Sequence, residues 1–124
     1  MKPNIIKQII GYTVSGPLDR AEKYYTIMST LNDLHLEKRE VQLMAFTAVK
    51  GNIWSKASRE EFVKEYKSSL ATVGNIITKL SKRHLLKKES KKVFVNKALL
   101  LDFNNTLILN INLVNDDKDR GEAS

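Results

Sequence analysis

The fold of this chain is decided by one stretch, SREEFVKEYKSSLATVGNIITKLSKRHLLKK (residues Ser58–Lys88). Ser58 is followed three residues later by Glu61, the spacing of a capping box, which predicts the start of a short helix. Ser69 is a second candidate N-cap, and apolar residues recur after it at helical spacing up to about Arg83. Two short helices joined by about three residues form the core of a helix-turn-helix.

The segments on either side extend this pattern. Leu85–Glu89 and Val93–Asn96 are short extended segments joined by a polar, lysine-rich turn, which predicts a β-hairpin. Upstream, Leu36–Lys50 is the clearest amphipathic helix of the chain, and Gly51 is a good stop signal. Ile53-Trp54 fits a single β-bridge. Helix, short strand, helix, helix and hairpin is the order of elements in a winged helix.

The two ends of the chain carry apolar segments outside this pattern. Asn4–Ser15 is rich in β-branched residues, which predicts a strand, and Leu18–Leu34 reads as a helix capped by Asp19. Ala98–Phe103 is expected to form a helical turn or a helix. Thr106–Val114 alternates apolar and polar residues, as a half-buried strand does.

Together these segments predict a mostly α fold with a small β component (α+β). We expect a winged helix-turn-helix with additional strand-like extensions at both termini. The parts are an N-terminal extension over 1–35, the winged helix over 36–97, a helical turn and strand over 98–114, and an acidic mobile tail over 115–124.

The stretch Ser58–Lys88 resembles the helix-turn-helix of MarR-like regulators and of winged-helix replication initiators from plasmids and phages. Ser69–Val73 has the small-polar, Thr, Val start of the recognition helix in that family, and Arg83–Lys88 has its basic and apolar exit into the wing. The other matching positions are Ser58, Phe62, Val63, Lys64, Ile76, Ile77 and Leu80.

The chain departs from the family in three places. Lys67 stands where the family usually has Gly in the turn, and Ser68 stands where it usually has an apolar residue. His84 occupies another position usually taken by Gly, at the end of the recognition helix, and we expect it to adopt a positive φ, which histidine tolerates. The terminal extensions have no counterpart in the helical dimerisation arms of MarR-like proteins, so a dimer of that type is not implied.

The positive charge of the chain lies in its middle third. Residues 56–97 hold twelve Lys/Arg and four Asp/Glu, a net charge of +8. Residues 1–55 have a net charge of +2 and residues 98–124 of −3, so the whole chain carries +7. A concentrated positive field attracts polyanions to one face. The alternative interpretation is a solvated, lysine-rich surface.

The resemblance implies that residues 69–83 enter the major groove of DNA and that lysines of the wing meet its phosphates. Thr72 can bond a phosphate or touch a thymine methyl, Asn75 can pair with adenine, and Lys79 can reach a phosphate or guanine. A polar, solvent-facing helix side is the alternative reading. The candidate DNA-binding residues are Ser69, Ala71, Thr72, Asn75, Thr78, Lys79, Lys82, Arg83, Lys87, Lys88, Lys91 and Lys92.

Composition excludes several other functions. With no cysteine in the chain, disulfides and thiolate chemistry are excluded. Two isolated histidines supply neither a metal site nor a catalytic set, so we expect no metal, no cofactor and no enzymatic activity. Trp54 and Phe94 are expected in the core. No apolar run reaches the roughly 20 residues that span a bilayer, so no membrane partner is expected.

Two functions remain. The first is a small, non-enzymatic protein that binds double-stranded DNA as a transcription or replication regulator of bacterial, plasmid or phage origin, in the cytoplasm of the bacterial host. The second is a winged-helix interaction or structural module, such as an adaptor in a phage virion or another large assembly. Its terminal strands would pair with a protein partner or with other copies of the chain in a homo-oligomer.

Overall fold

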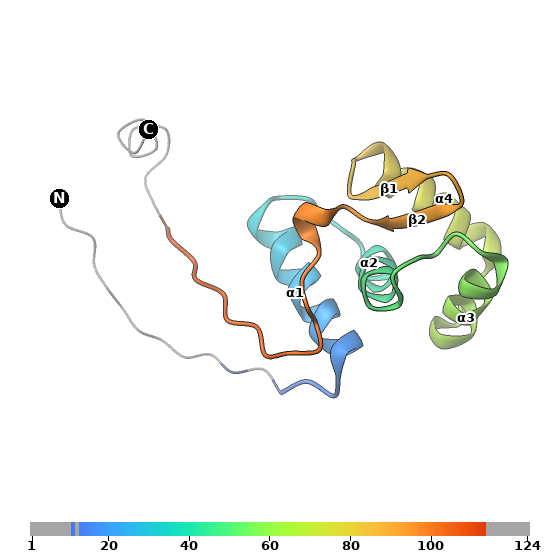
Figure 1. Cartoon of the computed structure of the whole chain (residues 1–124). Coiled ribbons are helices and arrows are strands. Elements are labelled where there is room, and N and C mark those ends of the chain that lie inside the picture. The colour runs from blue at the N-terminus through green and yellow to red at the C-terminus, as the bar shows by residue number, and fades with distance from the viewer. Residues whose placement is uncertain (1–10, 12, 114–124) are drawn as a thin grey trace.

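The computed structural model describes residues 11 and 13–113 of the 124-residue chain. In this part the chain forms four helices and a two-stranded antiparallel sheet (Figure 1), which confirms the small α+β fold. None of these helices is both long enough and apolar enough to cross a membrane. The elements are α1 (Pro17–Leu31), α2 (Lys38–Lys50), α3 (Lys56–Tyr66), α4 (Leu70–Lys82), β1 (Leu86–Glu89), β2 (Lys92–Val95) and the 3-10 helix η1 (Lys97–Leu99).

Helix α2 lies in the middle of the fold, with α1 on one side and α3 and α4 on the other (Figure 1). Seven of its residues are buried, because the helix is covered on most of its circumference. One apolar cluster joins all the helices to the hairpin, and the rings of Phe46 and Phe62 meet edge to face at 5.4 Å within it. Burial of each such side chain stabilises the fold by about 1.5–3 kcal/mol.

The N-terminal caps of α1 and α3 differ from the predicted ones. Ser55, not Ser58, caps α3, because its Oγ accepts the N–H of Ser58 at 3.1 Å. The predicted capping box at Ser58 is wrong, since two serines three residues apart fit the same local pattern. Asp19 is not an N-cap either. It lies inside the first turn of α1, where its carboxylate accepts the N–H of Ser15 at 3.0 Å.

Left-handed backbone conformations end three of the helices. Gly51 ends α2 with φ 91°, and Lys67 ends α3 with φ 51°. His84 follows α4 with φ 62°, which confirms the expectation for this residue. The N–H of Leu85 then donates to the carbonyl of Leu80 at 3.0 Å, the bond that closes a Schellman motif. The two non-glycine residues each strain the backbone by about 1–2 kcal/mol.

The hairpin matches its prediction in place and type. Leu86 pairs with Val95 and Glu89 with Lys92, so the turn lies at residues 90–91. Leu86, Val93 and Val95 are buried and turn one face of the hairpin toward the core.

The segment before α3 runs beside β2. The N–H of Ile53 donates to the carbonyl of Val93 at 2.9 Å, a single contact in place of the expected β-bridge. Ile53 is fully buried, whereas Trp54 is 44% exposed. The expectation of a buried Trp54 is wrong, because neighbouring side chains of an extended segment point to opposite sides and Ile53 takes the inner one. Phe94 is half-buried for the same reason, between Val93 and Val95.

After the hairpin the chain returns along α1 (Figure 1). The hydroxyl of Tyr25 donates to the carbonyl of Leu99 at 2.8 Å, and the guanidinium of Arg20 donates to that of Phe103 at 2.6 Å. Phe103 is 4% exposed and its ring packs against Tyr24 and Tyr25. This part of the C-terminal segment therefore belongs to the same core as α2.

The predicted strand over Thr106–Val114 is wrong for residues 106–113. Alternating side chains favour an extended chain, but a strand also needs a paired neighbour, and no described segment pairs with this one. Leu107 is half-buried, while Ile108 and Leu113 are 85% and 92% exposed. Most of the predicted N-terminal strand over 4–15 lies outside the described residues, as does the acidic tail over 115–124.

Candidate nucleic-acid interface

Helix α4 has one buried and one exposed side. Its buried residues are apolar and pack into the core, which fixes the rotation of the helix about its own axis. Ala71, Asn75, Thr78 and Lys82 follow one another at intervals of four, three and four, so they form a single row on the exposed side. We call these four residues the α4 stripe.

The first turn of α4 carries its N-cap. Ser69 Oγ accepts the N–H of Thr72 at 3.1 Å, which confirms Ser69 as the cap, and the two hydroxyl oxygens lie 2.9 Å apart. Both residues are exposed at the tip of the helix. The hydroxyl of Thr78 donates to the carbonyl of Gly74 at 3.0 Å. Asn75 makes no side-chain hydrogen bond to any described residue, so its amide is available to an external ligand.

The register of the hairpin assigns its four predicted lysines to different places. Lys87 lies opposite Phe94 and Lys92 opposite Glu89, on the face turned away from the core. Lys88 lies opposite buried Val93, on the core-facing side near the tip. Lys91 is in the turn. All four are exposed, and none of them forms an ion pair within the described part of the chain.

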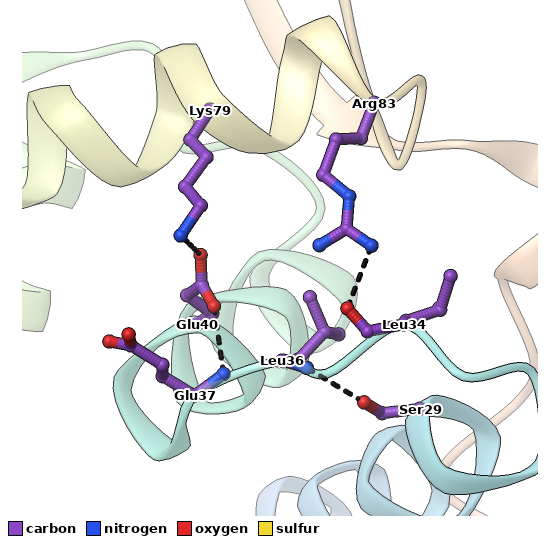
Figure 2. Close-up of polar contacts among 7 residues, drawn as sticks. All are labelled: Ser29, Leu34, Leu36, Glu37, Glu40, Lys79 and Arg83. Atoms are coloured by element: carbon purple, nitrogen blue, oxygen red, sulfur yellow. Dashed lines mark hydrogen bonds and ion pairs between the residues drawn. The ribbon is translucent and has the colours of Figure 1, made fainter.

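Two of the twelve predicted residues are directed toward the protein. Lys79 Nζ lies 3.1 Å from Glu40 Oε2 of α2, and Arg83 Nη2 donates to the carbonyl of Leu34 at 2.7 Å. Figure 2 shows both side chains extending from α4 toward the start of α2. They lie one turn apart on a side of α4 next to the stripe. The structure therefore separates these two cations from the other ten candidates.

The junction between α3 and α4 is held from α2. The guanidinium of Arg39 donates to the carbonyl of Tyr66, the last residue of α3, and also to Gln42 Oε1 at 3.2 Å. A cation at this end of a helix is favourable, because the unpaired carbonyls there carry partial negative charge. Burial raises the pKa of the Tyr66 phenol, which is therefore neutral at physiological pH.

The charge around the α4 stripe is mostly positive. Residues 67–97 contain nine Lys/Arg and a single carboxylate, Glu89. Two of the three carboxylates of α3 are paired with lysines outside this surface: Glu60 with Lys56 at 3.7 Å and Glu61 with Lys50 at 2.9 Å. The surface of α4 and the hairpin is consequently positive, with an uncharged polar tip.

Sequence reasoning missed two exposed residues beside this surface. Trp54 follows Ile53, which bonds to β2. Ile53 is β-branched and suits the inner position of a strand-like segment, and this was the one sequence signal that its neighbour Trp54 would be exposed. Lys67 lies at the exposed junction of α3 and α4. The high net positive charge of residues 56–97 was the sequence signal that Lys67 could belong to this surface.

The surface offers hydroxyl, amide and ammonium groups, which bond to base edges and phosphates. Within the described residues, no three His, Asp or Glu side chains gather as a metal ion would require. Comparisons of the chain with protein-family models, with curated proteins and with solved structures found no significant match.

Proposed function

We propose that this chain is a winged helix-turn-helix protein that binds double-stranded DNA. Helix α4 enters the major groove with the α4 stripe toward the bases, and the hairpin is the wing, whose lysines lie along the phosphates. The observation that carries the proposal is the excess of positive charge in residues 67–97, nine Lys/Arg against one carboxylate, around an uncharged polar helix tip.

The dimensions and chemistry of α4 suit a duplex. Its 13 residues span about 20 Å, and the major groove, about 12 Å wide, admits a helix. Ala71 and Thr72 are short, so the first turn of α4 can approach the base edges closely. Asn75 carries the amide that pairs with adenine through two hydrogen bonds. Lys82, two turns further on, lies where the helix leaves the groove and meets the backbone.

The biological role proposed with this binding is regulation of transcription or replication in a bacterium, plasmid or phage. This part rests on the resemblance of residues 58–88 to MarR-like regulators and winged-helix replication initiators. We propose a non-enzymatic role in the bacterial cytoplasm, in which the protein acts by occupying DNA.

A titration of duplex DNA at several salt concentrations tests the proposal. Binding through phosphates releases counterions, so the logarithm of the association constant falls linearly with the logarithm of salt, by about 0.9 per phosphate contact. Replacing Lys87 and Lys91 with Gln should reduce this slope by about 1.8. Lys23→Gln/Lys38→Gln, on α1 and α2, removes the same charge and should leave the slope unchanged.

The outcomes separate the two explanations of the basic surface. Equal effects of the two double variants would mean that net charge alone attracts DNA, and the proposed wing would be wrong. Absence of duplex binding by the parent protein at low salt would contradict the whole proposal. Circular dichroism of each variant checks that the fold is retained.

A second function, docking to a protein neighbour or to further copies of this chain, is favoured by residues 106–113. This extended segment exposes Ile108, Ile111 and Leu113, and its backbone forms no hydrogen bonds to described residues. Such a segment can add to the edge of a neighbouring sheet. Light scattering over a range of protein concentrations tests it: a larger mass that Ile111→Lys returns to the monomer supports docking, and a constant monomer mass contradicts self-association.

A further inference from the structure

A buried carboxylate connects α2 to α4 (Figure 2). Glu40 Oε1 accepts the N–H of Glu37 at 2.7 Å and so completes the capping box of α2. Glu40 Oε2 lies 3.1 Å from Lys79 Nζ, at ion-pair distance but without the alignment of a hydrogen bond, and has no other polar partner among the described residues. The Glu40 side chain is 3% exposed, whereas that of Lys79 is 57% exposed.

A second contact lies one turn along α4. Arg83 donates to the carbonyl of Leu34, and the N–H of Leu34 donates to the carbonyl of Ser29 on α1 at 2.9 Å. The N–H of Leu36 donates to Ser29 Oγ, also at 2.9 Å. The loop that receives Arg83 is thus itself held by α1. We call the contacts Glu40–Lys79 and Leu34–Arg83 the α2–α4 clasp.

The burial of Glu40 decides which way Lys79 is directed. An exposed ion pair contributes little, and an exposed lysine could exchange its partner freely. A carboxylate buried without its counter-charge is strongly disfavoured, because neither water nor another cation compensates it. If Lys79 turned to a phosphate, Glu40 would be left in that state.

We propose that Glu40 is a positioning residue for nucleic-acid binding. It keeps the Lys79 ammonium away from the phosphates and, through the α2–α4 clasp, fixes the orientation in which α4 presents its stripe. This proposal rests on the proposed function of α4. Lys82 is then the cation of α4 that meets a phosphate, although Lys79 is also a lysine and lies only three residues away.

Two lysine variants on the same helix provide the matched test. Lys82→Gln should reduce the salt slope of duplex binding by about 0.9, the loss of one phosphate contact. Lys79→Gln should weaken binding several-fold at every salt concentration without changing the slope, because it disturbs orientation only. A slope loss for Lys79→Gln equal to that of Lys82→Gln would show Lys79 on a phosphate and overturn the proposal.

Glu40→Gln supplies the reciprocal test. The glutamine amide keeps the oxygen that accepts the hydrogen bond from the Glu37 N–H, but it lacks the negative charge that holds the Lys79 ammonium. The released ammonium can then reach the DNA, so the slope should steepen by about 0.9. The double variant Glu40→Gln/Lys79→Gln should return the slope to its parent value, and a slope unchanged in Glu40→Gln overturns the proposal.

Thermal unfolding without DNA separates this proposal from the function on which it rests. The melting temperature shifts of Glu40→Gln and Lys79→Gln should be strongly non-additive in the double variant, whereas those of Glu40→Gln and Lys82→Gln should add. Additive shifts for the first pair would overturn the clasp itself. Absence of duplex binding by the parent overturns both proposals, whereas equal slope losses for the two lysine variants overturn the positioning role alone.

Discussion

Lys67 and His84 flank α4, and both hold the left-handed backbone conformation that glycine adopts most easily. The chain must turn sharply at each point, from α3 into α4 and from α4 into the hairpin. A side chain at these positions lowers the stability of the fold, but at position 67 it adds a cation beside the first turn of α4. At position 84, just before the hairpin, the loss of stability can be measured directly by mutation.

Replacing His84 with Gly should stabilise the protein by about 0.5–1 kcal/mol, since relief of the strained φ exceeds the added entropy of the unfolded chain. His84→Ala is the control, because alanine keeps the β-carbon that causes the strain and should give no gain. Urea denaturation of the two variants checks this. A gain of equal size in both would place the effect in the imidazole instead of the backbone.

Trp54 is the only tryptophan of the chain, so the tryptophan fluorescence of the protein reports on its environment alone. Its side chain is 44% exposed in the folded protein, and acrylamide should therefore quench the native fluorescence readily, though less than it quenches the denatured protein. Substitution by Ala should cost less than the roughly 3–5 kcal/mol of a fully buried aromatic residue, because the side chain is only partly covered. Strong protection from acrylamide before unfolding would contradict the exposed placement.

The sequence predicted the position of Lys79 on α4 but not the direction of its side chain. Helical periodicity correctly placed this residue on the surface of α4, because it depends only on spacing along the chain. The direction of its ammonium depends on Glu40, 39 positions earlier, and on the burial of that carboxylate by the packing of α2. No local pattern contains this information, and the same holds for Arg83 and Leu34.

At the scale of elements, α4 combines strong patterning with one weak point. Gly74 lies in the middle of the helix, and a β-carbon built there meets no atom within 4 Å. Glycine inside a helix is less favourable than alanine by about 1 kcal/mol. Gly51 provides a contrast, because it has similar open space but a φ of 91°.

These two glycines form a matched pair for mutation. Gly74→Ala should raise the free energy of unfolding by about 0.5–1 kcal/mol through helix propensity. Gly51→Ala should lower it by about 1–2 kcal/mol, since alanine is strained at that φ. Chemical denaturation measures both, and a stabilising Gly51→Ala would contradict the left-handed end of α2.

The elements that the sequence predicted well are those with their own start and stop signals. Ser69 and the following apolar period set α4, and the polar turn at 90–91 sets the hairpin. The segment over 106–113 had the alternation of a strand but finds no pairing partner among the described residues. Strand formation depends on a second segment, so it is predictable only when both are recognised.

At the scale of the whole molecule, the C-terminal segment stabilises the fold mainly through Phe103, with Leu107 partly packed against the same core. The phenylalanine ring closes an aromatic group with Tyr24 and Tyr25 on α1, and the hydroxyl of Tyr25 reaches Leu99. The core therefore includes α1 and the chain that follows the hairpin, in addition to α2–α4 and the hairpin.

Phe103→Ala should lower the free energy of unfolding by about 3 kcal/mol or more, because it leaves a cavity in this group. Ile108→Ala, five residues further on and 85% exposed, should change it by at most about 0.5 kcal/mol. Thermal or urea unfolding of both variants gives the comparison. Similar losses in the two would mean that Ile108 also packs against the fold, contrary to its exposure.

The exposed segment over 106–113 affects how the protein behaves in concentrated solution. It contains no charged residue, in a chain whose net charge is +7. Repulsion between whole molecules keeps such segments apart at low ionic strength, but near 0.1 M salt it extends only about 10 Å. The unpaired backbone of this segment, flanked by exposed apolar side chains, then becomes a nucleus for intermolecular sheet growth. Added salt should thus reduce the colloidal stability of this protein even where folding stability is unchanged.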